Sequence, residues 1–88
     1  MMEEKILQDL EDWLINSKHF KSRSARDVKC RLKRLDGISP IPLIGEENSY
    51  YLYDLEKNKE FQNLTTTVKS QLRRSKRIFD EYCENRKL

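Results

Sequence analysis

The chain has 88 residues, a formal net charge of +3 and a mean hydropathy of −0.91. A single domain of this size buries only a modest core, so a deep catalytic cleft between two domains is not expected. Charged residues make up 38% of the chain and hydrophobic residues 36%, but the apolar residues recur at helical spacing, so we expect the chain to fold. No apolar run approaches the roughly 18 residues of a membrane span. The acidic start is unlike a signal or transit peptide, and together these features predict a cytoplasmic protein.

Charge is distributed unevenly along the chain. Segments 21–35 and 65–79 carry +6 and +5, whereas segments 1–20, 36–64 and 80–88 carry −3, −4 and −1. A single basic run is ordinarily a solvated helix face. Two runs separated by acidic segments also suit a surface for an anionic partner, and both interpretations stay open at this point.

The first predicted helix covers residues 3–18. Apolar side chains recur on one side of it, at Ile6, Leu10 and Trp13, while its acidic side chains lie largely opposite. Because an acidic face repels phosphate, we assign this helix to packing, with Trp13 as a core anchor. A polar turn follows and contains the only histidine, His19.

No catalytic or metal-binding pattern is present in the sequence. One histidine without a paired carboxylate or nucleophile does not make an acid–base site. His19, Cys30 and Cys83 are too few and too widely spaced for a four-ligand zinc site. Both cysteines are expected to be free thiols. We therefore predict a chain that is not an enzyme and has no catalytic residue, metal, cofactor or small-molecule substrate.

The second predicted helix covers residues 23–36. Ser22 is a candidate cap, Ser24 and Asp27 have capping-box spacing, and Gly37 can adopt the left-handed conformation that ends a helix. The buried stripe of this helix is expected to be Ala25, Val28, Leu32 and Leu35. Its opposite side is expected to hold Arg23, Arg26, Cys30, Lys33 and Arg34, with Lys29 at the flank.

An apolar loop and a short helix are predicted next. Pro40 and Pro42 exclude a helix interior, so residues 38–45 should form a loop that packs on the core or offers a docking surface. A short third helix is predicted over residues 48–57, followed by a polar break. Its apolar side would hold Tyr51, Leu52 and Leu55, with Tyr50 and Tyr53 nearer the rim.

The last predicted helix covers residues 65–84, and the rest of the chain is organised around it. No acidic residue interrupts its sequence from Thr65 to Phe79. Segment 28–34 matches segment 68–74 at an offset of 40 residues, which indicates two similar basic helices or a chance similarity. The core-facing stripe is Val68, Leu72, Ser75, Phe79 and Tyr82. The opposite side holds Ser70, Arg73, Arg74 and Arg77.

This order of elements resembles a known module. An acidic first helix, a second helix that starts with serine and a short third helix precede a last helix that opens Leu64-Thr65-Thr66-Thr67-Val68 and continues through Leu72, Phe79 and Tyr82. Over residues 3–84 the pattern is similar to the N-terminal core-binding (SAM-like) domain of tyrosine recombinases, the phage integrase family. The resemblance implies an all-α fold, a small four-helix orthogonal bundle of the SAM-like integrase core-binding type, forming one domain over residues 1–88.

In that family the domain clamps duplex DNA opposite a separate catalytic domain, with its second and fourth helices across the duplex. By position, the resemblance implies DNA-binding roles for Arg23, Arg26, Lys29, Lys33, Lys69, Ser70, Arg73, Arg74 and Arg77. The chain also departs from the family pattern. Ala25 stands where a threonine is common, and the aromatic residue often found in the middle of the second helix is absent.

The resemblance implies double-stranded DNA as a partner, together with either a recombinase catalytic domain or sister protomers. It leaves open whether the chain is a domain of an integrase or a free-standing relative. Because phosphate contacts do not read bases, sequence selectivity would be weak. The side chains expected nearest to base edges are Gln71, Arg73 and Arg74. The alternative is a SAM or death-like protein–protein interaction module without nucleic-acid binding. Such a module would use its basic helices against acidic surfaces and the proline loop as a hydrophobic contact.

Overall fold

The computed structural model describes residues 3–42 and 47–86, and every regular element in those ranges is a helix. In chain order the helices are α1 (Glu4–Asn16), α2 (Ser22–Ile38), α3 (Glu47–Leu55), α4 (Lys59–Gln62) and α5 (Thr66–Arg86). The prediction of an all-α fold is therefore confirmed for the described residues. The four predicted helices correspond to α1, α2, α3 and α5, with boundaries that differ by one or two residues.

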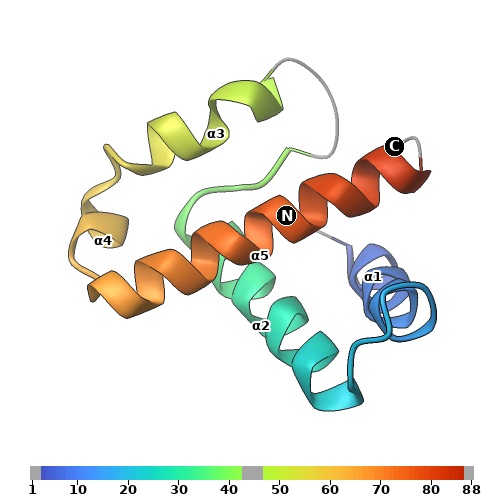
Figure 1. Ribbon diagram of the computed structural model, residues 1–88. Helices are drawn as coiled ribbons and strands as arrows, with labels where there is room; N and C mark the ends of the chain where they lie inside the picture. The colour runs from blue at the N-terminus through green and yellow to red at the C-terminus, as the bar shows by residue number, and fades with distance from the viewer. Residues whose placement is uncertain (1–2, 43–46, 87–88) are drawn as a thin grey trace.

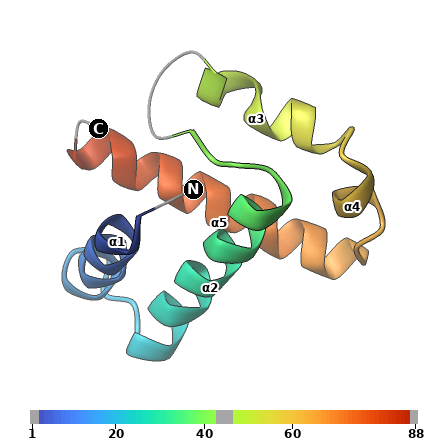
Figure 2. The same cartoon turned by 180° about the vertical axis from the view of Figure 1, so that it is seen from behind.

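The longest helix, α5, crosses the middle of the molecule (Figures 1 and 2), with α1 and α2 on one side of it and α3 on the other. Helix α2 packs against both α1 and α5, and α1 also contacts α5. The radius of gyration is 12.6 Å, close to the value of about 12 Å for a compact chain of this length. The two basic helices are thus direct neighbours in one bundle.

The predicted apolar stripes form the core. Leu10 on α1, Leu32 on α2 and Phe79 on α5 are all fully buried. Trp13 and Tyr82 pack edge to face with ring centroids 5.6 Å apart, which anchors α1 on the C-terminal half of α5. The other stripe residues of α5 follow the prediction, since Val68 is half-buried and Leu72 and Ser75 are buried. The 3.6-residue periodicity therefore identified the core correctly.

Both ends of α2 differ from the prediction. Its N-cap is Lys21, no side chain caps its first turn, and Ser22 is already helical, so the predicted serine cap is wrong. Gly37 lies inside the helix, and the prediction that it ends the helix is also wrong. The helix continues to Ile38 and stops at Ser39, whose φ of −150° and ψ of 116° are extended. Ser39 precedes Pro40, and the proline ring pushes the preceding residue out of the helical region.

A helical turn, α4, occupies the region predicted to be a polar break. The Asn58 side chain accepts a hydrogen bond from the Phe61 backbone N–H at 3.1 Å, which is an N-cap for the turn. Phe61 itself is fully buried. A cap followed by a buried aromatic residue therefore makes this short segment helical despite its polar composition.

The segment after α2 is tied to the core by polar bonds. The Asp36 carboxylate accepts a hydrogen bond from the Ile41 backbone N–H at 2.9 Å, and Ile41 is buried. The Tyr51 hydroxyl on α3 donates to the Ser39 carbonyl at 2.6 Å. The prediction that this loop packs on the core is confirmed for Ile41. The predicted contacts of Leu43 and Ile44 lie outside the described residues.

A buried lysine joins α5 to the same region. Lys76 is fully buried, forms an ion pair with Asp80 one turn later, and its Nζ lies 5.1 Å from the centroid of the Tyr51 ring. The sequence places Lys76 directly after the buried Ser75, at the edge of the core stripe. Because burial of a lysine requires a charged partner, the ion pair with Asp80 stabilises Lys76 where it meets Tyr51 of α3.

The stability of the fold should fall at alkaline pH. Burial raises the pKa of Tyr51 from its ordinary value of 10.0 to about 12. Burial, followed by the charge of Asp80, raises the pKa of Cys83 from 9.0 to about 11. Burial and then the hydrogen bond to Asp9 also raise the pKa of Tyr82. The unfolded chain releases these protons first, so the stabilisation is complete below about pH 9 and is lost as the pH rises towards about 12.

Urea unfolding across this pH range measures the loss. The midpoint should fall steadily above about pH 9, and replacing the exposed Tyr50 by phenylalanine should not change that trend. A midpoint that stays constant up to about pH 11 would show that these three groups ionise as readily in the folded state as in the unfolded chain.

Candidate nucleic-acid interface

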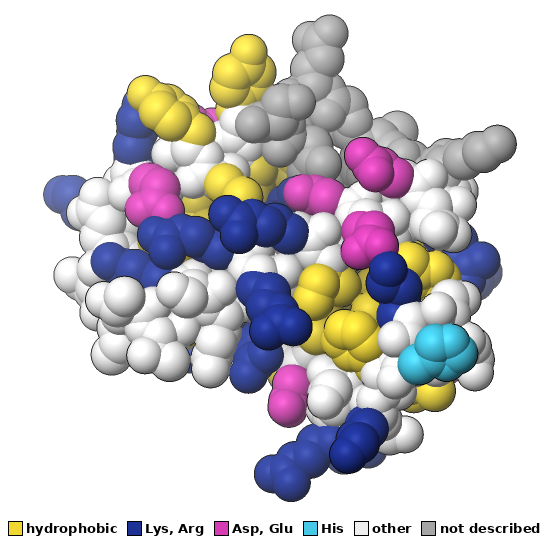
Figure 3. Space-filling model, viewed as in Figure 1, with side chains coloured by type: hydrophobic (Ala, Val, Ile, Leu, Met, Phe, Trp, Pro, Cys, Tyr) yellow, Lys and Arg dark blue, Asp and Glu magenta, His cyan; other side chains and the backbone are white. Residues whose placement is uncertain are grey.

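A groove lies between the N-terminal half of α2 and the middle of α5, and we call it the α2–α5 groove. Two arginines face it, Arg31 from α2 and Arg74 from α5. The turn before α2 forms one end of the groove, where His19 has a left-handed φ of 59°. The lining residues are His19, Phe20, Lys21, Ser24, Asp27, Val28, Arg31, Arg74, Ser75 and Ile78. Figure 3 shows Lys and Arg side chains gathered on the face where α5 crosses the molecule.

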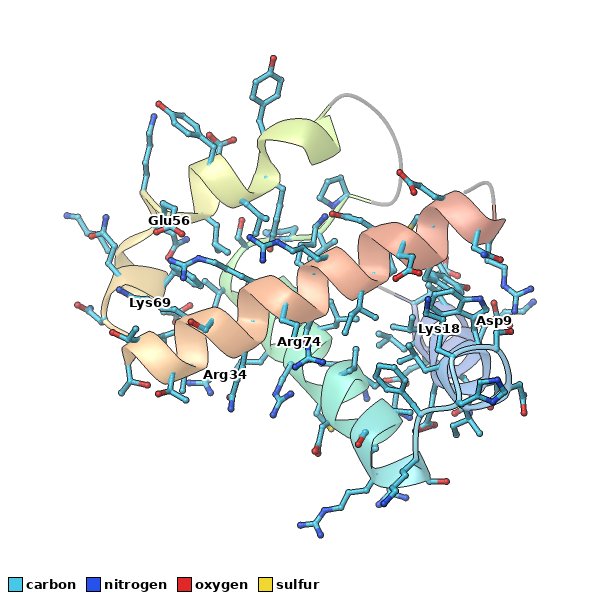
Figure 4. All side chains as sticks on the ribbon, in the orientation of Figure 1. Asp9, Lys18, Arg34, Glu56, Lys69 and Arg74 are labelled. Carbon is cyan, nitrogen blue, oxygen red and sulfur yellow. The ribbon has the colours of Figure 1, made fainter. Side chains whose placement is uncertain are left out.

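Helix register explains why these arginines meet. Arg31 lies three residues after the buried Val28, so it stands at the edge of the α2 stripe that packs on α5. Arg74 directly precedes the buried Ser75 and stands at the matching edge of α5. Arg34 follows Arg31 by three residues and extends the same side of α2. Figure 4 shows Arg34 and Arg74 on the same side of α5, below it in that view.

The groove has a surplus of positive charge. Within residues 3–42 and 47–86, no carboxylate oxygen lies within 4.0 Å of a nitrogen of Arg31, Arg34 or Arg74. Asp27 is the one acid among the described residues that line the groove, and three of the lining residues are Lys or Arg, namely Lys21, Arg31 and Arg74. A guanidinium group offers several N–H donors in a planar fork that matches phosphate or carboxylate oxygens. The groove can therefore bind an anion through both helices at once.

Two lysines implied by the resemblance to contact DNA are paired with acids of α1. Lys29 Nζ lies 3.2 Å from Glu11 Oε1, and the lysine side chain is only 18% exposed. Lys33 Nζ lies 2.7 Å from Glu4 Oε1. The hydrogen bond from Lys33 lowers the pKa of Glu4, and the same bond raises the pKa of Lys33. These lysines contribute to the packing of α1 on α2 and lie on another side of α2 from the groove arginines.

Arg73 is also held by an acid. Its Nη2 lies 2.5 Å and its Nε 2.7 Å from Glu56 Oε1, beyond the end of α3. The Arg73 guanidinium carbon lies 5.4 Å from the centroid of the Phe61 ring, and Lys69 Nζ lies 5.9 Å from the same centroid. Figure 4 places Lys69 and Glu56 together on the α3 and α4 side of the molecule. These cations cover Phe61 and face away from the α2–α5 groove.

The remaining implied residues are exposed. Arg23 and Arg26 lie in the first turns of α2, and Ser70 and Arg77 lie on α5 next to Arg74 in the helical register. The structure thus brings Arg74 to the groove and leaves Arg77 and Ser70 beside it. Arg31 is not among the DNA-binding residues that the sequence and the family resemblance implied. Arg31 lies between Val28 and Leu35 in the sequence, at the edge of the buried stripe of α2, and this position is the sequence feature that indicates a side chain facing α5.

The described part of the chain contains no group of three or more His, Cys, Asp or Glu side chains that could hold a metal ion. None of its helices combines the length and the apolar character that crossing a membrane requires. Cys30 is exposed and Cys83 is buried, and both are free thiols. Comparisons with protein-family models, curated proteins and solved structures find no match to this chain.

Proposed function

We propose that this chain is a DNA-binding module that grips the phosphate backbone of duplex DNA with α2 and α5. The observation that carries the proposal is the α2–α5 groove, where Arg31 and Arg74 come together from two helices without a carboxylate partner among the described residues. Among the other cations of these two helices, Lys29, Lys33 and Arg86 pair with acids of α1, Arg73 pairs with Glu56, and Lys76 pairs with Asp80 on α5 itself. Arg31 and Arg74 are therefore the cations of α2 and α5 that line the α2–α5 groove without an ion pair to the described residues.

Duplex DNA suits this groove better than a small anion does. The groove is open, and exposed cations continue from it along both helices, at Arg34 on α2 and Arg77 on α5. A line of cations on two helices can neutralise several phosphates and release their counterions, which supplies most of the affinity of non-specific binding. Because phosphate contacts do not read bases, sequence selectivity would be weak.

The finer proposal is that the module is of the integrase core-binding type and acts in site-specific recombination. The order of an acidic helix, a basic helix, a short helix and a long basic helix supports it, as does the direct packing of α2 on α5. In this proposal the chain binds DNA in the cytoplasm and catalyses nothing. Strand exchange would belong to a separate recombinase domain or to sister protomers.

Titration with duplex DNA at about 50 mM and about 200 mM salt tests the proposal. If Arg31, Arg34, Arg74 and Arg77 each neutralise one phosphate, the slope of log K against log salt should be about −3.6, at about 0.9 for each contact. The affinity should then fall about 100-fold between the two conditions. A second duplex of unrelated sequence should bind with a similar affinity and slope.

A protein-interaction module would give a different result. It would bind both duplexes weakly, and the weak binding would lack a slope that depends on the phosphate charge. That outcome would reject the nucleic-acid proposal and leave the basic helices as a surface for an acidic protein.

A further inference from the structure

A second groove lies between α3 and the proline segment that follows α2, and we call it the tyrosine groove. Pro40 and Pro42 form one side of it, and tyrosines of α3 form the other. Tyr50 and Tyr53 are 63% and 64% exposed, whereas the aromatic residues of the core are almost completely covered. Figure 3 shows hydrophobic side chains standing out from the α3 side of the surface. Exposed tyrosines of this kind are typical of interfaces, because an apolar ring carries a polar hydroxyl.

The fold holds both sides of the tyrosine groove in place. Tyr50 and Tyr53 are three residues apart, so they lie on the same side of α3. Tyr51, between them, is buried, and its hydroxyl donates a hydrogen bond to the Ser39 carbonyl at 2.6 Å. This bond joins α3 to the residue that precedes Pro40. The groove is therefore preformed, and a ligand would not need to order it.

We propose that the tyrosine groove binds a proline-rich peptide that carries an arginine or a lysine. Proline-rich segments form extended left-handed helices without internal hydrogen bonds, and they dock in grooves lined by aromatic rings. The phenol hydroxyls can donate to the free carbonyls of such a peptide. A volume of about 450 Å³ is large enough for a few proline residues.

Charge at the groove indicates a basic partner. Asp54 lines the groove, and its carboxylate forms no ion pair with the described residues. A cation on the peptide would supply the missing partner. Lys57 Nζ lies over the Tyr53 ring, 4.3 Å from its centroid, and covers only part of that ring. The Asp54 carboxylate disfavours the phosphates of a single-stranded nucleic acid, whose bases could otherwise stack on the tyrosines.

A second copy of this chain fits the groove less well. Its own proline segment is short, and the Ile41 side chain at its centre is buried. That segment is also tied to its own fold through Asp36 and Tyr51. It is therefore not available as an extended ligand for a neighbouring copy.

Nuclear magnetic resonance titration of the full chain tests the proposal, with an oligoproline peptide that ends in arginine as the probe. The amide signals of Tyr50, Tyr53 and Asp54 should shift together and saturate. The same peptide ending in glutamate should bind about two- to fivefold more weakly, since an exposed ion pair contributes that much. Replacing both exposed tyrosines, Tyr50→Ala with Tyr53→Ala, should weaken binding at least about tenfold.

Asp54→Asn has a matched control in Glu60→Gln, which removes the same charge from an exposed residue of α4 outside the groove. Only Asp54→Asn should abolish the preference for the arginine peptide. The proposal is overturned if the peptide causes no shifts, or if the double tyrosine variant binds it as tightly as the parent. It is also overturned if an oligothymidylate strand, or dilution of the protein alone, moves the tyrosine signals while the peptide does not.

Discussion

Replacing Leu72 by alanine is expected to lower the free energy of unfolding by about 2 to 5 kcal/mol. Leu72 is 1% exposed at the centre of the α5 stripe, and α5 packs on both α1 and α2. The substitution removes buried methyl groups and leaves a cavity that neighbouring helices fill only in part. A domain of this size has a total stability on the order of 5 to 10 kcal/mol, so the substitution removes a large part of it.

Urea unfolding followed by circular dichroism measures this loss. Leu64→Ala is a matched control, because it deletes the same atoms from a half-buried residue just before α5. It should cost less than half as much. If the midpoint of Leu72→Ala equals that of the parent, α5 does not pack in this register, and the assignment of its arginines to a face fails with it.

The double substitution Arg31→Gln with Arg74→Gln is expected to weaken duplex binding about tenfold for each arginine lost and to reduce the salt slope by about 1.8. These arginines face the α2–α5 groove from two different helices. Glutamine keeps a good helix former at both positions, so the fold should be retained. The loss should be similar on unrelated duplexes, because phosphate contacts carry no sequence information.

The control is Lys29→Gln with Lys33→Gln, which lowers the net charge by the same amount. Both lysines already pair with Glu11 and Glu4 of α1, so their removal should change the salt slope much less. Equal losses for the two double variants would mean that total charge, and not the groove, governs binding. A loss confined to the lysine variant would restore the assignment that the family resemblance implied.

Local periodicity was sufficient to predict α1, α2, α3 and α5 and their core sides, but not the helical turn α4. On α5, Leu72, Ser75 and Phe79 recur at spacings of three and four residues, and a helix presents such residues on one side whatever it packs against. The boundary errors arose where two local signals competed. At the end of α2 the constraint that Pro40 places on Ser39 decided the boundary, and Gly37 remained helical.

Tertiary packing decided which basic side chains form ion pairs with acids from other parts of the chain. The sequence shows Lys29, Lys33 and Arg73 as members of two basic runs, but it does not show that Glu11, Glu4 and Glu56 approach them from other helices. It likewise does not show that Lys76 is buried against Tyr51 and Asp80.

Arg31 and Arg74 are 43 positions apart in the chain and share a groove only because α2 packs on α5. Helical periodicity depends on neighbours within one turn, and the sequence determined it alone. The pairing of distant charges depends on how helices cross, which only the folded chain decides.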